Sequence, residues 1–332
     1  MPRRRLLTAL GATTLVVLAG CSSPTDPASE DGALKISSCG EKLSFSGTPE
    51  RVVTMDQSTT ENLLELGVQD RMIGTSNLKT KIAPEYKAAY DKIKVLSPDV
   101  LTAEQLREAA PDLAVSPFVS HFTPDRVGTR EELHELGLQS YVSAVDCPKD
   151  NDPEANPFDR MFTDFENYGE IFGVEKAAGK LIEEQKEVLD TARDTGEELK
   201  DKPSVVWIYS VYDGKPYVAG KNSMPAEMSR LSGVDNIFDD VDEVWPEVTW
   251  EDVAERDPDI VVVGDLSERG QTGDSAEEKL DMMREDPAVS ELTAVKKDRI
   301  IEVPGIEMDP SVRTVNTLQR FLDGLTDLGY AG

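Results

Sequence analysis

The apolar and polar positions of this chain fall into two long stretches in which short apolar runs alternate with helical patterns. In the first stretch, runs of strand length begin at Val52, Arg71, Leu113 and Tyr141. In the second, they cover residues 204–209, 259–263 and 299–303. Strands separated by helices indicate a mostly parallel sheet with helices on both faces. The sequence therefore predicts an α/β protein with two lobes, over residues 34–157 and 202–332.

Between these stretches the pattern changes to a persistent helical period. Residues 158–201 read as helix, with an interruption near Gly173, after which Val174, Leu181 and Val188 fall on one apolar stripe. We expect this segment to be a helical linker that joins the lobes as a spine. Because one helix is stiffer than paired extended linkers, we expect only modest closure of the lobes on ligand binding.

One pattern occurs twice, about half the chain apart. It begins at Glu104 and again at Glu251, has an apolar residue two positions on (Leu106, Val253), and ends in Pro-Asp before an apolar run. Each copy predicts a short helix that proline stops, followed by a strand. The repeat indicates similar lobes, each of which presents one acid at a matching surface position.

Two local signals predict helix starts. Ser58 to Glu61 has the pattern of a capping box, which predicts a helix from Glu61 to Leu66. Asp309-Pro310 reads as an N-cap followed by proline at the first helical position, which predicts the start of the last helix.

The N-terminal end has the pattern of an export signal. Three arginines at positions 3–5 precede an apolar run that ends in Leu18-Ala19-Gly20-Cys21. The run predicts a signal peptide over residues 1–20, too short to span a bilayer stably. Its end resembles a lipobox, which implies that Cys21 becomes the mature N-terminus and carries lipid. An ordinary signal peptide before an unrelated cysteine is the alternative.

Residues 21–33 are polar and lack apolar periodicity, so we expect a lipidated, flexible tether. The protein would then be exported and anchored to the outer face of the cell membrane through lipid alone. In a cell with two membranes this face is the periplasmic one. Arg3-Arg4 also resembles a twin-arginine signal weakly, which leaves the export route open.

Charge narrows the range of partners. The chain has 64 acidic and 35 basic residues, a formal net charge of −29. Such an excess of negative charge excludes nucleic acid and bare anionic lipid as partners. A well-solvated surface accounts for acidity of this kind in many proteins, and attraction to a basic docking partner is the functional alternative.

Two cysteines remain beyond Cys21. Cys39 precedes the first sheet strand, and Cys147 follows the apolar run at Tyr141. An exported protein meets an oxidising environment, so we predict that these cysteines pair.

Five segments occur in order across nearly the whole mature chain. They are RVVTMDQSTTENLLELG at 51–67, PDL at 111–113, LSGVDNIF at 231–238, WPEVTWE at 245–251 and TAVKKDRI at 293–300. Together they resemble the substrate-binding lipoproteins of ABC importers for ferric siderophores, cobalamin and haem. The resemblance implies Rossmann-like lobes on a helical backbone, a monomer without enzymatic activity, and an ABC permease dimer with its ATPase as partner. It also implies that Glu104 and Glu251 dock on the permease, although a helix dipole favours a carboxylate at such positions regardless of function.

In doubly wound sheets the ligand lies beyond the carboxyl ends of the strands. The loops there carry aromatic and basic groups that suit a bulky, partly anionic chelate, and an arginine at a helix start adds charge to free backbone N–H groups. Ordinary packing is the alternative for the tyrosines. The predicted ligand-binding residues are Gln57, Ser58, Thr59, Asn77, His121, Tyr212, Tyr217, Lys221, Trp245 and Arg313.

His121 leaves three roles open. It could be an axial haem ligand with Tyr212 or Tyr217 opposite, a hydrogen-bond donor, or an exposed side chain. Since the chain has only two histidines, we expect no bare metal-ion site.

These features favour a receptor that captures a ferric siderophore-type chelate, with no resident cofactor. Haem, cobalamin and a deazaflavin-cofactor precursor are the alternatives within the same family. An extracellular enzyme and a sensor lipoprotein are alternatives of other classes. For the enzyme, the sequence has no Gly-x-Ser-x-Gly elbow, phosphate-binding glycine loop or metal motif.

Overall fold

The computed structural model describes residues 33–147, 150 and 155–332. Residues 33–332 form one compact unit. The predicted signal peptide, Cys21 and all but the last residue of the predicted tether lie outside the described residues.

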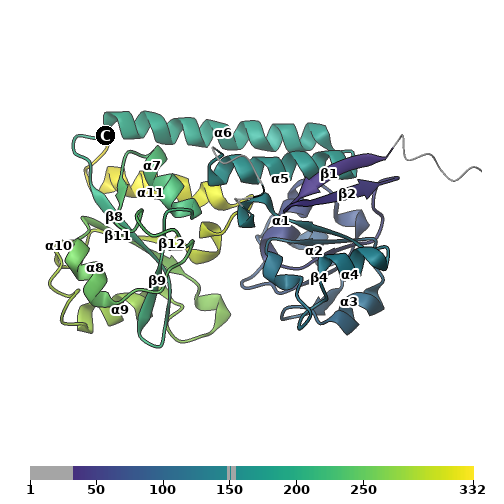
Figure 1. Ribbon diagram of the computed structural model, residues 1–332. Helices are drawn as coiled ribbons and strands as arrows, with labels where there is room; N and C mark the ends of the chain where they lie inside the picture. The colour runs from purple at the N-terminus through teal and green to yellow at the C-terminus, as the bar shows by residue number, and fades with distance from the viewer. Residues whose placement is uncertain (1–32, 148–149, 151–154) are drawn as a thin grey trace, which may run out of the picture. The chain divides into compact units, whose positions relative to one another are not determined.

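The first lobe contains a fully parallel sheet of five strands in the order β5-β4-β3-β6-β7. An antiparallel hairpin of β1 and β2 precedes it (Figure 1). The strands are β1 Leu34–Ser38, β2 Glu41–Phe45, β3 Val52–Thr54, β4 Met72–Ser76, β5 Val95–Ser97, β6 Leu113–Ser116 and β7 Gln139–Val142. The helices are α1 Gln57–Glu65, α2 Lys87–Tyr90, α3 Ala103–Ala109 and α4 Arg130–Glu135.

The second lobe has a sheet in the order β10-β8-β11-β12, with β9 paired antiparallel to β8. Its strands are β8 Ser204–Tyr212, β9 Lys215–Val218, β10 Asp235–Asn236, β11 Ile260–Asp265 and β12 Ile300–Pro304. The helices are α7 Met224–Leu231, α8 Trp250–Arg256, α9 Ala276–Glu285, α10 Thr293–Lys296 and α11 Thr314–Asp327. The central strand β11 is buried along residues 260–264, as expected for a parallel strand covered on both faces.

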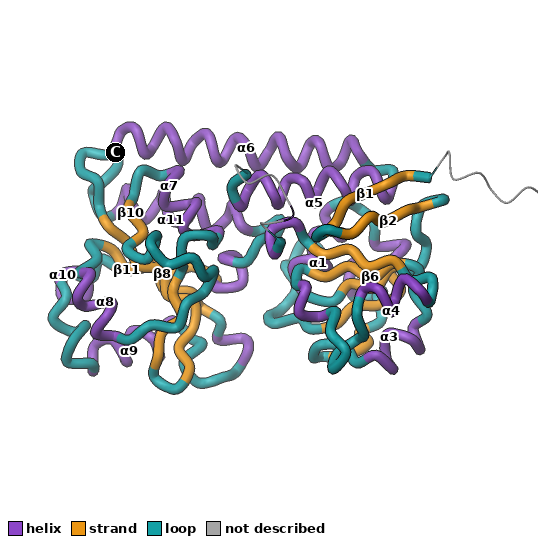
Figure 2. Tube along the Cα trace, viewed as in Figure 1, coloured by secondary structure: helices purple, strands orange, loops and turns teal. Residues whose placement is uncertain are grey.

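Two helices connect the lobes. Helix α5, Pro157–Phe172, ends at Gly173, whose φ of 68° is left-handed and therefore suits glycine. Helix α6, Glu175–Glu198, follows and packs against α5 and also against α7 and α11 of the second lobe (Figure 2). Its buried face carries the predicted stripe, including Ala178, Leu181, Leu189 and Ala192. The predicted break near Gly173 is confirmed.

The repeated segment folds in the same way in both lobes. Thr102 caps α3 and Thr249 caps α8, each through a capping box, so the two glutamates are the second residue of their helices. Leu106 and Val253 are fully buried beneath these helices. Each helix then ends in a left-handed residue before β6 or β11 begins. The predicted structural repeat is therefore confirmed, with each helix beginning one residue before its glutamate, after a threonine N-cap.

Both predicted helix starts are wrong. Helix α1 begins at Gln57, because Asp56 at the end of β3 accepts the backbone N–H of Ser58 at 3.2 Å and serves as the N-cap. Helix α11 begins only at Thr314, after a 3-10 turn over Gly305–Met308. Asp309 does not cap it, because its carboxylate contacts Lys79 and accepts from Tyr209.

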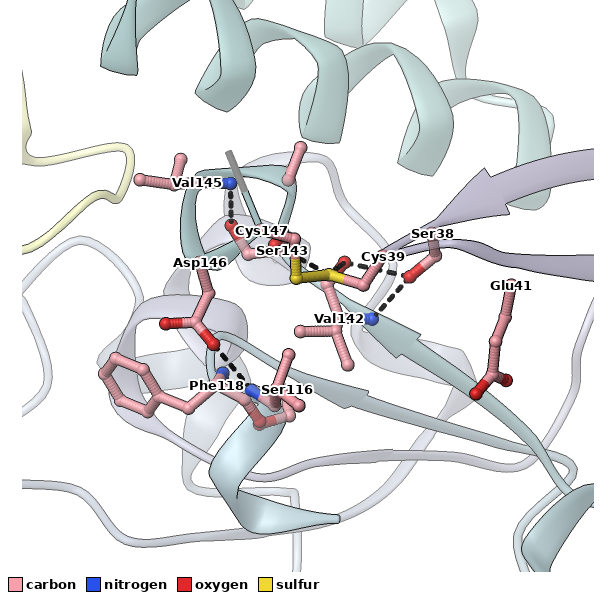
Figure 3. The surroundings of a disulfide bond; sticks show 12 residues. Ser38, Cys39, Glu41, Ser116, Phe118, Val142, Ser143, Val145, Asp146 and Cys147 are labelled. Atoms are coloured by element: carbon pink, nitrogen blue, oxygen red, sulfur yellow. Dashed lines mark hydrogen bonds between the residues drawn. A yellow bond between two sulfur atoms is a disulfide. The ribbon is translucent and has the colours of Figure 1, made fainter. Parts of the chain in front are cut away.

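A disulfide joins Cys39, which follows β1, to Cys147, which follows the 3-10 turn Ala144–Asp146 (Figure 3). Their Cα atoms lie 5.4 Å apart. Next to the bond, Ser38 Oγ donates to the carbonyl of Val142 at 2.9 Å and accepts its N–H at 2.8 Å. The hairpin is thereby attached to the end of β7.

We predict that this disulfide forms in the exported protein and stabilises it strongly. The bond closes a loop of 108 residues, for which the chain-entropy treatment gives about 4 to 5 kcal/mol. Urea unfolding of the Cys39→Ser/Cys147→Ser variant should show a loss of this size, and reduction of the wild type should match it. Two alkylatable thiols in the non-reduced protein, or equal unfolding midpoints, would contradict the prediction.

Candidate functional site: a cavity between the lobes

Two buried polar groups at the start of α1 organise the loop after β4. We name residues 77–83 the strap. Gln57, which is wholly buried, accepts the backbone N–H of Lys79 at 3.1 Å and of Thr80 at 2.9 Å, and its amide donates to the carbonyl of Lys81 at 3.3 Å. Asn77 donates to Asp56 Oδ2 at 3.0 Å. Gln57 and Asn77, both predicted to bind ligand, therefore use their side chains to hold the strap.

The strap reaches across to the second lobe at two points. Lys79 Nζ lies 3.2 Å from Asp309 Oδ2, and it also lies 3.8 Å from Asp56 Oδ2 in its own lobe. Lys81 donates its backbone N–H to Glu268 at 2.6 Å, and its ammonium lies 2.7 Å from the same carboxylate. Sequence reasoning missed Lys79, because the strap has no periodicity; its position after β4, at the carboxyl edge of the sheet, was the available signal.

A third polar contact lies where α1 meets the start of α11. Arg313 donates to Glu307 Oε1 at 2.9 Å and to Glu61 Oε1 at 3.4 Å, and both carboxylates are buried. Burial raises the pKa of Glu61, and the neighbouring Arg313 partly offsets that rise. Asn62 in α1 accepts the N–H of Val312 at 2.9 Å. Arg313 is the N-cap residue of α11, so its predicted place at a helix start is confirmed, and its charge is engaged by these two carboxylates.

Between the lobes lies a cavity of about 200 Å³ with walls from both. Phe118 and Asp146 line it from the first lobe, and Trp245 and Asp309 line it from the second. Phe118 and Asp146 lie beside the disulfide (Figure 3). Trp245 stacks on Tyr209 with ring centroids 4.6 Å apart. The cavity offers aromatic faces and carboxylates, and the structure places the predicted Trp245 on its wall.

Other cavities lie along the same inter-lobe region. Spaces of about 640 Å³ and about 270 Å³ are both lined by Thr80, Lys81, Glu268 and Arg313. Ligand pockets commonly hold about 300 to 1,000 Å³, so the aromatic cavity alone is small. The strap, with its two cross-lobe contacts, borders these spaces.

His121 is 3% exposed, and its Nδ1 lies 2.8 Å from Ser116 Oγ. Phe118 meets its ring edge-on at 5.4 Å. Burial, with smaller contributions from Arg126 and Lys79, lowers the pKa of His121 to about 4. The structure therefore places His121 as a neutral, hydrogen-bonded side chain beneath the surface of the first lobe.

The low pKa of His121 predicts a pH-dependent stability. Between pH 6.5 and pH 4 the unfolded chain protonates this histidine while the folded protein does not, so stability falls as pH falls, by up to about 3 kcal/mol. His121→Asn keeps an amide where Nδ1 lies and does not titrate. Urea unfolding should show the variant gaining about 2 to 3 kcal/mol relative to wild type between pH 7.5 and pH 4.5.

Asp164 provides the control for that experiment. Burial raises the pKa of its carboxyl to about 6, although Ser143, Ala144 and Tyr141 donate to it. The cost of ionising Asp164 disappears as pH falls, so this group makes the wild-type protein more stable in acid. Relative to wild type, Asp164→Asn should therefore lose stability as pH falls, which is the opposite of the change expected for His121→Asn. A His121→Asn variant whose stability runs parallel to wild type over this range would show that the histidine titrates normally.

The remaining predicted ligand residues lie outside the aromatic cavity. Ser58 and Thr59 are buried, and both contact Asp56. The rings of Tyr212 and Tyr217 meet edge-on at 5.3 Å. The hydroxyl of Tyr217 donates to Glu247 at 2.8 Å, while the exposed Lys221 lies 4.0 Å from Asp242.

Arg269 is a second residue that sequence reasoning missed. It donates to the hydroxyl of Tyr212, and its Nε lies 3.0 Å from Asp274 Oδ2. It ends the 3-10 turn Ser267–Arg269 that follows β11, so its place near the carboxyl edge of that strand was the available signal. Tyr212, Tyr217 and Arg269 form a separate aromatic and basic cluster of the second lobe.

The predicted docking residues Glu104 and Glu251 are exposed, each in the first turn of a short capped helix. Among the described residues, no group of three or more His, Cys, Asp or Glu side chains could hold a metal ion. Within the same part of the chain, no helix has both the length and the apolar character needed to cross a membrane.

Two α/β lobes, two connecting helices and a cavity between the lobes define a two-lobed solute-binding protein. The family described as periplasmic binding protein matches residues 52–306, and the chain belongs to it. Members of this family are extracytoplasmic binding proteins that take part in transport and are not enzymes. They work with the permease and the ATPase of an ABC transporter, and they bind siderophores, haem or cobalamin.

Three relatives show the range of this family. An ABC transporter substrate-binding lipoprotein of Bacillus subtilis (strain 168), YvrC, is 24% identical over 94% of this chain and 92% of its own length. A cobalamin-binding protein of Halobacterium salinarum is 25% identical over 78% of this chain and 68% of its own. The solved structure of an ABC-type Fe³⁺-hydroxamate transport system from Saccharomonospora viridis is 26% identical, with a TM-score of 0.72, over 88% of this chain and 98% of that one.

Proposed function

We propose that this protein is an exported, lipid-anchored receptor that captures a ferric siderophore-type chelate between its lobes and delivers it to an ABC permease. The observation that carries the proposal is the cavity whose aromatic walls, Phe118 and Trp245, come from different lobes. A ligand held between them contacts both lobes at once. Binding then sets the relative position of the lobes, which the permease senses through Glu104 and Glu251.

The chemistry of the cavity supports a chelate with an apolar exterior. Phe118 and Trp245 cover apolar area, and Met224 and Met308 add polarisable, adaptable side chains. The similarity to a hydroxamate transport system supports a ferric chelate. Cobalamin is the second candidate, because the Halobacterium relative is named for it.

Haem finds less support in the site. An axial histidine needs an accessible ring nitrogen, whereas His121 is only 3% exposed. Tyr217 is engaged with Glu247, and Tyr212 accepts a hydrogen bond from Arg269.

Tryptophan fluorescence tests the proposal directly. The chain has three tryptophans, of which Trp207 is fully buried and Trp250 is 7% exposed, while Trp245 lines the cavity. Titration with a ferric trihydroxamate should quench the emission with a dissociation constant of about 1 μM or tighter. Trp245→Phe should lose most of the quenching, and Trp250→Phe should keep it.

The protein purified from its native host provides a second readout. A broad visible charge-transfer band is expected for a bound ferric chelate. A Soret band would show haem instead, and corrinoid bands would show cobalamin. Failure of every ferric chelate to change the fluorescence would contradict the proposed ligand class.

A further inference from the structure

Lys79 lies among three residues from both lobes, Asp56, Phe118 and Asp309, which we name the cage. Its ammonium lies 3.2 Å from Asp309 Oδ2 of the second lobe and 3.8 Å from Asp56 Oδ2 of the first. The ring of Phe118 lies beneath it, with 5.3 Å between Nζ and the ring centroid. Tyr209 donates its hydroxyl to Asp309 Oδ2 at 3.2 Å, which fixes that carboxylate. Two carboxylates and an aromatic face are the groups that bind an alkylammonium ion.

The cage places two carboxylates against the single ammonium of Lys79. Asp56 and Asp309 are 1% and 7% exposed, and Asp146 adds a further carboxylate on the cavity wall. Three further cations are engaged elsewhere: Arg313 pairs with Glu61 and Glu307, Lys81 with Glu268, and Arg269 with Asp274. Burial by itself lowers the pKa of Lys79, but Asp309 and Asp56 raise it above its ordinary value. The environment thus favours positive charge.

The cage opens onto the aromatic cavity. Phe118 and Asp309 belong to both, and the Lys79 side chain keeps 22% of its exposure. The backbone of the strap is held by Gln57 independently of the Lys79 side chain. Because a lysine stem is flexible, the ammonium can leave the cage while the strap stays in place.

We propose that Asp56, Asp309 and Phe118 form an alkylammonium site, which Lys79 occupies in the free protein and which a cationic arm of the ligand takes over. The ligand class is then a ferric chelate with a pendant primary ammonium, and this part rests on the proposed function. A ligand ammonium restores the link between the lobes that Lys79 gives up. The carboxylates of Asp56 and Asp309 repel a polyanionic chelate, so the site discriminates against ligands of that class.

Chemical rescue tests the cage without any chelate. Lys79→Ala removes the four side-chain atoms beyond Cβ, which n-propylammonium replaces. At 100 mM, n-propylammonium chloride should raise the Tm of this variant by about 2 °C or more above sodium chloride at equal ionic strength. The matched control is Lys81→Ala, because Lys81 lies on the same strap but is 84% exposed and pairs with Glu268. It should show no such gain, and neither should Lys79→Ala/Asp309→Asn. Equal Tm values in the two salts, or an equal gain in Lys81→Ala, would overturn the site.

The wild-type protein supplies an independent measurement. Ferrioxamine B is a linear ferric trihydroxamate with one primary ammonium, and its N-acetylated form is the same chelate without that charge. We expect the cationic form to bind about tenfold more tightly, and Asp309→Asn to bring the ratio close to one. The trianionic ferric enterobactin should not compete. Equal affinities for the two forms, or tighter binding of the trianion, would overturn the ligand class.

The two experiments separate the two proposals. Rescue by n-propylammonium with no chelate binding would support the cage and contradict the proposed function. If the chelate bound equally well with and without N-acetylation, and n-propylammonium gave no rescue, the proposed function would be supported and the cage would be overturned.

Discussion

We expect iron uptake through the proposed permease to fall to the level of a strain lacking the protein when Glu104 and Glu251 are both replaced by arginine. Both side chains are exposed, each at the second position of a capped helix whose buried residue, Leu106 or Val253, fixes it on its lobe. Reversing both charges turns attraction to a basic permease surface into repulsion, which we expect to cost at least 100-fold in docking affinity, about 3 kcal/mol. Chelate affinity should remain within twofold of wild type, because neither residue lines the cavity.

The same helices supply the matched control. Glu108 in α3 and Glu255 in α8 are also exposed, and they lie further along each helix, away from its first turn. The Glu108→Arg/Glu255→Arg variant changes net charge equally and should keep most of the uptake. Equal loss in both variants would show that overall charge matters rather than these two positions. Loss of chelate affinity in the Glu104/Glu251 variant would refute a docking role.

Replacing Arg313 with methionine has a large expected effect on stability. The substitution leaves the buried carboxylates of Glu61 and Glu307 without their main partner, which costs about 3 to 5 kcal/mol for a broken buried pair. Urea unfolding should show this loss. Arg313→Lys keeps the charge but loses the paired hydrogen bonds to Glu307, and should lose about half as much.

A double-mutant comparison separates this structural role from ligand binding. Glu61→Gln added to Arg313→Met should recover part of the lost stability, because one unpaired charge is removed. If Arg313 served mainly as a ligand contact, Arg313→Met would weaken chelate binding while its unfolding free energy stayed within about 1 kcal/mol of wild type.

The sequence predicted those parts of the fold that depend on patterns internal to one segment. The alternation of strands and helices, the break at Gly173 and the repeated helix before β6 and β11 all follow from periodicity, proline and glycine. The β1–β2 hairpin and β9 escaped prediction, since short strands with few buried positions have little apolar signal. The late start of α11 escaped because contacts with Lys79 and Tyr209 use the carboxylate expected to cap it.

The candidate site was predictable only as a region. The rule that ligands lie beyond the carboxyl ends of strands led to Gln57, Asn77, Trp245 and Arg313. It could not say which of them face a cavity, because their partners come from distant segments. Gln57 holds the strap 22 residues away, and Arg313 pairs with Glu61 at a separation of 252. Trp245 alone among these four lines the aromatic cavity.

The position of the disulfide determines how the fold carries mechanical load. A pull on the N-terminal end of the described chain enters at β1 and reaches Cys39 just after that strand ends. From there the covalent bond passes the force to Cys147, which lies beyond β7. The force therefore bypasses the hydrogen bonds of the strands between the two cysteines. Under tension applied at the N-terminal end, the segment between the two cysteines, which includes Phe118 and the strap, is therefore shielded from the pulling force.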